Sequence, residues 1–490
     1  MQNRKYSNLI FGNYLADRNI NPVALFLPIV AFFLTFSLLI NPRLFSLLPI
    51  YIIAIMFLIF VPELLIIAII VFTSTIFPLD AFPQPISFGN IGLYLPETLI
   101  VVLLIRTILT SLIKKDFKKI SSEMTAPMIL LFIWIIFSVA NAIISQRADL
   151  LKAILNVRSY VYYANFFLIL YYIDTPKKLN LLIKTSIIMA TVCAIFSLVQ
   201  FMIGPETKIF PWFTWVVGSV VYQSKESVAR VFPKSLSIIY TALFPVFVGF
   251  INRALKRKWL YMLFLLVFIS AIFISFTRAI HYSLLFGFLI IWLVIKGKMR
   301  YRLIRNLITV LLFVFLIIIY LPLQLGFMKV TNWWGIMFER HSEFLTSGAA
   351  TETLTWRAIE SMTIMNEIKK SPIIGNGIGA TYYHPLYNDN VALAHNGYLS
   401  LLFQLGLVGL LIMCLIFYHF IYQSIKYYRQ TNDIYDKSLI LGFLTVFISI
   451  LPSAFSEPIF IKDYWWISLL GIIWAMPIVI SKIGTNKAEP

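Results

Sequence analysis

The sequence is poor in charged residues: only 12% of its 490 residues are Asp, Glu, Lys or Arg, whereas 60% are hydrophobic. Apolar runs near ~20 residues recur from end to end, which excludes a soluble protein. The two cysteines, Cys193 and Cys414, lie inside different apolar runs and offer neither a disulfide framework nor a metal cluster. Residues 1–21 contain charge and no long apolar core, so we expect no removable signal peptide.

Acidic residues are scarcer than basic ones, 21 against 40, which gives a net charge of +19. The Lys and Arg residues stand in short clusters between apolar runs, where they orient membrane spans. The basic balance therefore implies a bilayer as partner and no nucleic acid.

The apolar runs predict an all-α, polytopic transmembrane protein with about 12–14 spans. Prolines at 42, 49 and 62 interrupt the early runs, so the number of spans in 41–77 stays open. The run 259–295 is too long for one span and must fold back, with its turn at 275–278. The predicted spans are 22–40, 44–60, 62–77, 91–113, 126–145, 157–173, 180–203, 232–251, 258–276, 278–296, 302–322, 396–424, 437–454 and 463–481.

The basic clusters fall on alternate connections between spans, which predicts that these connections and both termini are cytoplasmic. Residues 1–322 then form the first eleven or so spans, 323–394 form one large extracytoplasmic loop, and 395–490 form the C-terminal spans. Within the loop we expect short helices, one of them amphipathic, starting at Thr353 or Thr355. Its expected apolar face is Ile359, Met362, Met365 and Ile368, and we expect it to stop at Lys369-Lys370-Ser371-Pro372.

Glycines at 375, 377 and 379 follow this helix and predict tight turns or a close backbone approach. They do not follow a strand or open a helix, so a dinucleotide-binding loop is disfavoured.

Three motifs occur in a fixed order in the second half of the chain. They are Thr277-Arg278-Ala279 at the turn between two spans, Trp356-Arg357-Ala358 with Ser371–Gly379, and Ala394-His395-Asn396-Gly397-Tyr398-Leu399 with Gly406–Leu410. In this order the chain, from about residue 230 to 409, resembles the O-antigen ligase family, which includes polymerases and some protein O-oligosaccharyltransferases. The sequence departs from the family pattern at two places. Lys234-Ser235-Leu236 replace the Asn that often follows the motif around Arg230, and Thr277 replaces the Ser that often precedes the arginine of the turn. These departures leave the subfamily and the acceptor open.

The resemblance implies a metal-independent membrane glycosyltransferase without a cofactor, which acts in cell-surface polysaccharide biosynthesis. Its donor would be an undecaprenyl-diphosphate-linked glycan, its acceptor a glycan, lipid or protein, and its active site on the extracytoplasmic face of the cytoplasmic membrane. Ligase and polymerase are not separated by the sequence.

The residues themselves fit this chemistry. A departing diphosphate needs fixed cations when no metal is present, and arginine suits phosphate oxygens, which favours Arg278 and Arg357. An imidazole exchanges a proton near neutral pH, which makes His395 the candidate general base for the acceptor hydroxyl. The secondary candidates are Arg158, Arg230, Asn396 and Tyr398.

Structural roles for the same residues stay open. Asn396 could be a helix N-cap with His395 at the membrane interface, Arg278 could snorkel, and Arg357 could pair with Glu360. His341 and His384 are interpreted as loop histidines, and no spacing typical of a zinc site is present.

A transporter of a small anion or of a lipid-linked glycan is the alternative function. Ion-coupled transporters usually carry acidic groups near the bilayer midplane, and the late predicted spans have none.

Overall fold

The computed structural model describes residues 61–74, 86–88, 91–203, 215–221, 227–233, 235–252, 254, 258–316, 348–385 and 388–486. Within these residues, seven helical segments are long and apolar enough to cross a membrane. They confirm the predicted all-α, polytopic fold class. Two predicted spans, 22–40 and 44–60, lie outside the described residues. The seven segments are α4 (Leu95–Lys114), α5 (Thr125–Ile144), the unit of α6 (Leu150–Val161), η4 (Tyr162–Ala164) and α7 (Asn165–Tyr172), α8 (Pro176–Ile203), α16 (Gly397–Gln430), α17 (Ile434–Ile450) with η6 (Leu451–Phe455), and α18 (Tyr464–Asn486).

Shorter helices occupy most of the other predicted spans. The turn expected at 275–278 lies between α10 and α11, where Phe276 has a φ of 49°. A helix with several basic residues, α12, follows the next connection. These helices are α3 (Pro62–Thr73), α9 (Leu236–Ile251), α10 (Lys258–Phe273), α11 (Arg278–Val294) and α12 (Lys298–Phe315).

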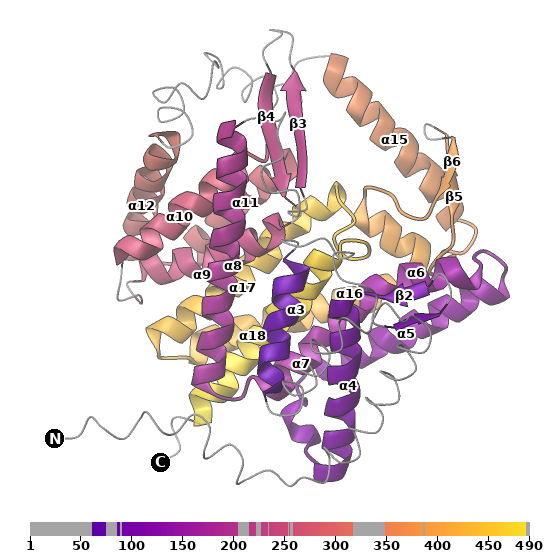
Figure 1. Cartoon of the computed structure of the whole chain (residues 1–490), viewed down its shortest axis with the longest axis horizontal. Coiled ribbons are helices and arrows are strands. Elements are labelled where there is room, and N and C mark those ends of the chain that lie inside the picture. The colour runs from indigo at the N-terminus through magenta and orange to yellow at the C-terminus, as the bar shows by residue number, and fades with distance from the viewer. Residues whose placement is uncertain are drawn as a thin grey trace, which may run out of the picture.

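The described residues include three antiparallel hairpins, which the sequence did not predict, in the connections between helices (Figure 1). They are β1 (Ile86–Phe88) with β2 (Ile91–Leu93), β3 (Trp215–Val221) with β4 (Ser227–Pro233), and β5 (Tyr382–His384) with β6 (Asp389–Val391). In β3–β4 the register pairs Gly218 with Arg230. The hairpins are too short to change the fold class.

The centre of the bundle is formed by α9, α17 and α18, which are labelled in the middle of Figure 1 and contact one another. Gly442 of α17 lies against Pro245 of α9, where a Cβ would come within 2.4 Å of the proline Cα. The Tyr240 hydroxyl also hydrogen-bonds to Ser449 Oγ at 2.9 Å. A small residue and a buried hydroxyl pair thus fix α9 against α17, as is common between membrane helices.

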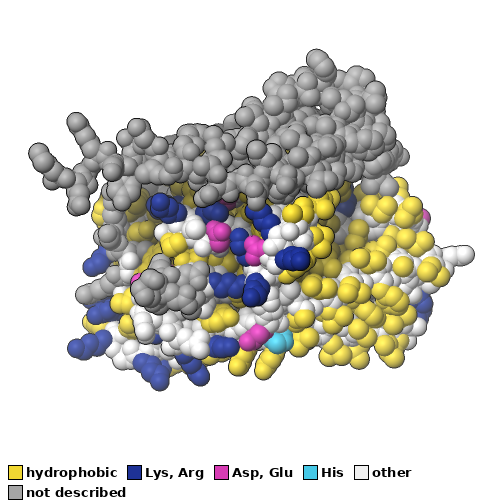
Figure 2. All heavy atoms as spheres, turned by 90° about the horizontal axis from the view of Figure 1, so that it is seen from below, with side chains coloured by type: hydrophobic (Ala, Val, Ile, Leu, Met, Phe, Trp, Pro, Cys, Tyr) yellow, Lys and Arg dark blue, Asp and Glu magenta, His cyan; other side chains and the backbone are white. Residues whose placement is uncertain are grey.

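Helix α5 shows how the bundle meets its surroundings. Met128, Leu131 and Ile135 are buried on the side that packs against α16. Ile133 and Ile136 point outward with 57% and 70% exposure, which suits a surface solvated by lipid rather than water. Figure 2 shows a broad hydrophobic area of this kind beside an area where Lys and Arg gather.

Candidate functional site

The site is built around a break in α16. Gly406 has φ 67° and ψ −172°, so the backbone leaves the helical conformation in the middle of this apolar segment. A break frees N–H and C=O groups that must find partners in a membrane. Segment 371–379 supplies them: Asn376 N–H donates to Phe403 O at 2.7 Å, and Leu407 N–H donates to Pro372 O at 2.9 Å.

The glycines of this segment confirm the predicted close backbone approach. Gly375, Gly377 and Gly379 have φ of 79°, 95° and 93°, a region that other residues rarely adopt. A Cβ at Gly375 would lie 2.5 Å from Gly406 N, and one at Gly377 would lie 2.5 Å from the Ala142 side chain. Because the Gly377 N–H donates to Gln404 O, it is used to hold α16 rather than to bind a phosphate.

Helix α15 (Gly348–Ile368) carries the next part of the site. It begins earlier than the predicted start at Thr353 or Thr355, and it ends as expected before Lys369. Of the predicted apolar face, Ile368 is buried, whereas Met362 and Met365 are 69% and 40% exposed.

The buried stripe of α15 is instead Glu360, Ile364 and Ile368, spaced by four residues. This stripe faces α16 and β5, which pack against α15. Apolar periodicity did not predict this stripe because it contains the charged residue Glu360.

Glu360 contacts His395 with both carboxylate oxygens. Its Oε1 lies 3.1 Å from His395 Nδ1, and its Oε2 accepts the backbone N–H of His395 at 3.1 Å. The Glu360 side chain is 3% exposed, whereas that of His395 is 44% exposed. In the tautomer that donates Nδ1–H to this carboxylate, Nε2 is the ring nitrogen that can accept a proton.

Two further aromatic residues enclose this pair. The Trp356 ring meets His395 edge-on with centroids 4.7 Å apart, and it lies 5.4 Å from the His384 ring. His384 on β5 is fully buried, and its Nε2 is 3.6 Å from Glu360 Oε1. Its interpretation as a loop histidine was therefore wrong: it belongs to the wall behind the site.

The two residues after His395 have structural contacts. The Asn396 side chain caps α16 by accepting the N–H groups of Tyr398 and Leu399 at 3.0 and 3.1 Å. The Tyr398 hydroxyl donates to Leu451 O at 2.9 Å. Both residues thereby fix the start of the helix that carries His395.

Arg357 and Arg278 lie on two different helices. Arg357 follows Trp356 on α15 and is half-buried, and among the described residues it forms no hydrogen bond or ion pair. In particular it does not pair with Glu360, whose carboxylate faces His395. Arg278 is half-buried and is the first residue of α11.

Helix η6 connects the starts of α11 and α16. Ser453 Oγ hydrogen-bonds to Ala279 O at 3.4 Å, and Leu451 O accepts the Tyr398 hydroxyl. Arg278 and His395 therefore lie at the same end of the bundle, each a few residues from η6.

Arg158 and Arg230 differ from each other in their surroundings. The Arg158 guanidinium donates through Nε and Nη2 to the buried Glu97 carboxylate, at distances of 2.9–3.3 Å, and lies over the Tyr94 ring. Such a buried pair is typical of a structural contact.

Arg230 lies on β4, next to Val231, whose N–H donates to Ile274 O at the end of α10. This backbone contact places Arg230 near the turn that leads to Arg278.

A cavity of about 160 Å³ opens at the same end of the bundle. It is lined by Ile280 at the start of α11, by Glu457 and Asp463 of the connection after η6, and by Trp465 and Trp466 of α18. The backbone carbonyl of Glu457 also touches Gly397, where a Cβ would lie 2.9 Å away. The cavity thus lies beside the start of α11, and one of its lining residues, Glu457, contacts the start of α16.

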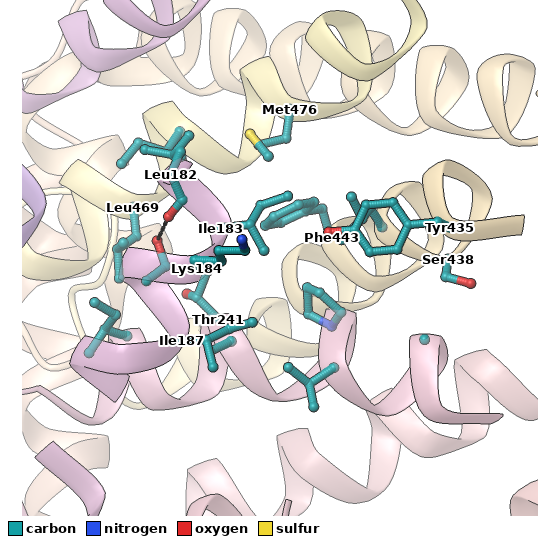
Figure 3. A pocket seen from close by; sticks show the side chains of 18 of the residues that line it. Leu182, Ile183, Lys184, Ile187, Thr241, Tyr435, Ser438, Phe443, Leu469 and Met476 are labelled. Carbon is teal, nitrogen blue, oxygen red and sulfur yellow. Dashed lines mark hydrogen bonds between the residues drawn. The ribbon is translucent and has the colours of Figure 1, made fainter. Parts of the chain in front are cut away.

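A second cavity, of about 80 Å³, lies among α8, α9, α17 and α18 (Figure 3). Apolar side chains such as Leu182, Phe443 and Met476 surround it, and among the described residues Lys184 is its one charged lining residue. The Ser186 hydroxyl donates to Leu182 O within α8. The described part of its lining therefore offers no pair of groups able to move a proton or hold a diphosphate.

Across the described part of the chain, no three His, Cys, Asp or Glu residues come together in a way that could hold a metal ion.

Comparison with known proteins identifies the central part of the chain. Residues 262–414 match the family model described as O-Antigen ligase. The matched range includes Arg278, Arg357 and His395, whereas Arg158 and Arg230 precede it. No curated protein was found to match the chain. Residues 262–414 of this multi-pass helical protein therefore form a region similar to the O-antigen ligase family.

Proposed function

We propose that the protein transfers a glycan from an undecaprenyl-diphosphate carrier to an acceptor hydroxyl at the extracytoplasmic face of the cytoplasmic membrane. The observation that carries the proposal is His395, whose Nδ1 faces a buried carboxylate while its ring stays half-exposed. This is the arrangement of a histidine general base with a carboxylate that orients it.

In the reaction, the acceptor oxygen attacks the anomeric carbon of the donor sugar and loses its proton to His395 Nε2. The bond between the anomeric carbon and the diphosphate oxygen breaks, and its electron pair leaves with the diphosphate. The imidazolium formed on His395 is stabilised by Glu360, 3.1 Å away.

Arg278 and Arg357 receive the diphosphate in this proposal. Charge on the leaving oxygens grows toward the transition state, so fixed cations stabilise that state more than the bound donor. The absence of a carboxylate partner for Arg357 among the described residues leaves its guanidinium available for phosphate oxygens.

We place a sugar ring in the cavity beside Ile280. Trp465 and Trp466 offer flat apolar faces there, and Glu457 and Asp463 can accept hydrogen bonds from sugar hydroxyls. The size of the cavity, about 160 Å³, suits one ring of a longer glycan.

The carrier lipids of a deletion strain test this function. Loss of a ligase should leave long glycan chains on undecaprenyl diphosphate, and loss of a polymerase should leave single repeat units. Complementation with the wild type should clear either species, and complementation with His395→Ala should not. Unchanged carrier-linked glycans in the deletion strain would contradict the proposed reaction and favour a transporter of another solute.

A further inference from the structure

A cavity of about 540 Å³, larger than the two described above, lies at the other end of α16 from His395. Its walls come from the end of α11, the start of α12, the last turns of α16 and the first turns of α17. From the break at Gly406 to Arg429, about 23 helical residues at 1.5 Å each place Arg429 roughly 35 Å from the break, on the side away from His395. A ligand here would therefore not be the reacting glycan.

The charged part of this cavity is entirely basic. Among the described residues, Lys296, Arg429 and Lys437 line it, and no carboxylate does. Lys437 is half-buried, and its ammonium lies over the Tyr428 ring, 5.1 Å from the centroid. Asp433 precedes Lys437 by one helical turn, but its carboxylate caps α17 by accepting the N–H of Asp436. The cavity thus favours an anion.

The remaining walls are apolar and are arranged along the helix axis. Leu441 and Leu444 follow Lys437 by four and seven residues, so they lie on the same face of α17, about 6 and 10 Å further along. The lining of the cavity therefore changes from cationic to apolar side chains along the axis of α17. In a phospholipid, the phosphate and the first carbons of the acyl chains are a similar distance apart.

We propose that this cavity binds an anionic diacyl phospholipid such as phosphatidylglycerol. Its phosphate lies among Lys296, Arg429 and Lys437, and the first carbons of its chains lie along Leu441 and Leu444. Basic pockets between membrane helices commonly hold anionic head groups, since the cations gain a partner that the bilayer itself supplies. The lipid would tie α11 and α12 to α16 and α17.

Native mass spectrometry of the purified protein in detergent tests the site. The wild type should retain phosphatidylglycerol in preference to phosphatidylcholine. The triple variant Lys296→Gln, Arg429→Gln, Lys437→Gln should retain at least about 10-fold less phosphatidylglycerol, because each cation adds to the attraction. A matched control is Lys298→Gln, Arg302→Gln, Arg305→Gln, which removes the same charge from α12 outside the cavity and should behave as the wild type.

Two further arms separate lipid binding from a loss of folding and from a free-phosphate site. A Lys296→Arg, Lys437→Arg variant keeps the charges and should retain the lipid, which distinguishes lost binding from lost folding. Glycerol phosphate, which lacks acyl chains, should not displace the lipid at equal concentration; efficient displacement would show a free-phosphate site and overturn the proposal. Equal retention of phosphatidylglycerol by the triple variant and the wild type would overturn it as well.

Discussion

Glu360 lies outside the three sequence motifs, but in the proposed reaction it orients and stabilises His395. It is buried, it contacts His395 through side chain and backbone, and it lies between two imidazoles. The sequence offered Glu360 only as a helix neighbour of Arg357. Its role could not be predicted because the contact joins residues 35 apart, across the loop that separates α15 from α16.

We predict that His395→Ala lowers glycan transfer by about 10² to 10⁴-fold, since the acceptor hydroxyl loses its base. Glu360→Gln should also slow transfer by about 10²-fold or more, because the amide no longer stabilises the imidazolium. Groups that act as a unit are not additive, so the double variant should be no slower than His395→Ala alone. Rates measured with purified protein and lipid-linked donor check this. Independent, multiplied losses would show that Glu360 does not act through His395.

For the arginines, we predict that Arg278→Ala and Arg357→Ala each lower transfer by roughly 10²-fold, with partial recovery in the Lys variants. Arg158→Ala makes a useful comparison because it strands the buried Glu97 carboxylate. It should lower the amount of folded protein rather than the rate per folded molecule, and Glu97→Ala added to it should restore part of the yield. A rate effect in Arg158→Ala at normal yield would instead place Arg158 in the site.

At the scale of elements, the distinctive feature is the break in α16. The glycine-containing segment 371–379 forms hydrogen bonds with the backbone groups beside this break. The break at Gly406 and the turns at Gly375 and Gly377 meet backbone to backbone. Segment 371–379 therefore sets the angle at which the first half of α16, with His395 at its start, leaves the bundle.

The prediction for this element uses three glycines. Gly377→Ala combines a φ of 95° with a Cβ 2.5 Å from the Ala142 side chain, so it should lower thermal stability strongly. Gly297→Ala has a φ of 57° and a ψ of −132° in open space and should cost only the backbone strain, about 1–3 kcal/mol. Gly484→Ala, with open space and no positive φ, should be neutral. Thermal unfolding in detergent compares them, and equal losses at Gly377 and Gly297 would mean that the contact with α5 contributes nothing.

Most of the helices were predictable from the sequence because many apolar runs have about the length of a span and basic residues separate them. The turn at 275–278 and the end of α15 before Lys369 were also predictable, because turns and helix ends have local sequence signals such as Lys-Lys-Ser-Pro. The packed face of α15 was not predictable from periodicity, because Glu360 and His384 are buried polar residues whose partners lie elsewhere in the chain. The hairpins were missed because their strands are three to seven residues long.

At the scale of the whole molecule, the proposed reaction proceeds without a divalent metal, since the leaving diphosphate has Arg278 and Arg357. We predict that purified protein with lipid-linked donor keeps its activity in a chelator, and that added magnesium has no large effect. His395→Ala serves as the inactive control for background transfer. Complete loss in chelator with recovery on magnesium or manganese would assign the diphosphate to a metal instead.

The last prediction concerns which side of the membrane holds His395. The charge pattern predicts that 323–394 lies outside and that the connection between α16 and α17 lies in the cytoplasm. Asn388 and Asn432 are exposed residues in these two places, before and after α16. In a background with Cys193→Ala and Cys414→Ala, Asn388→Cys should react with a membrane-impermeant thiol reagent in intact spheroplasts. Asn432→Cys should react only after permeabilisation. The reverse pattern would put the site in the cytoplasm and the basic clusters outside. It would therefore contradict the topology predicted from the charge pattern.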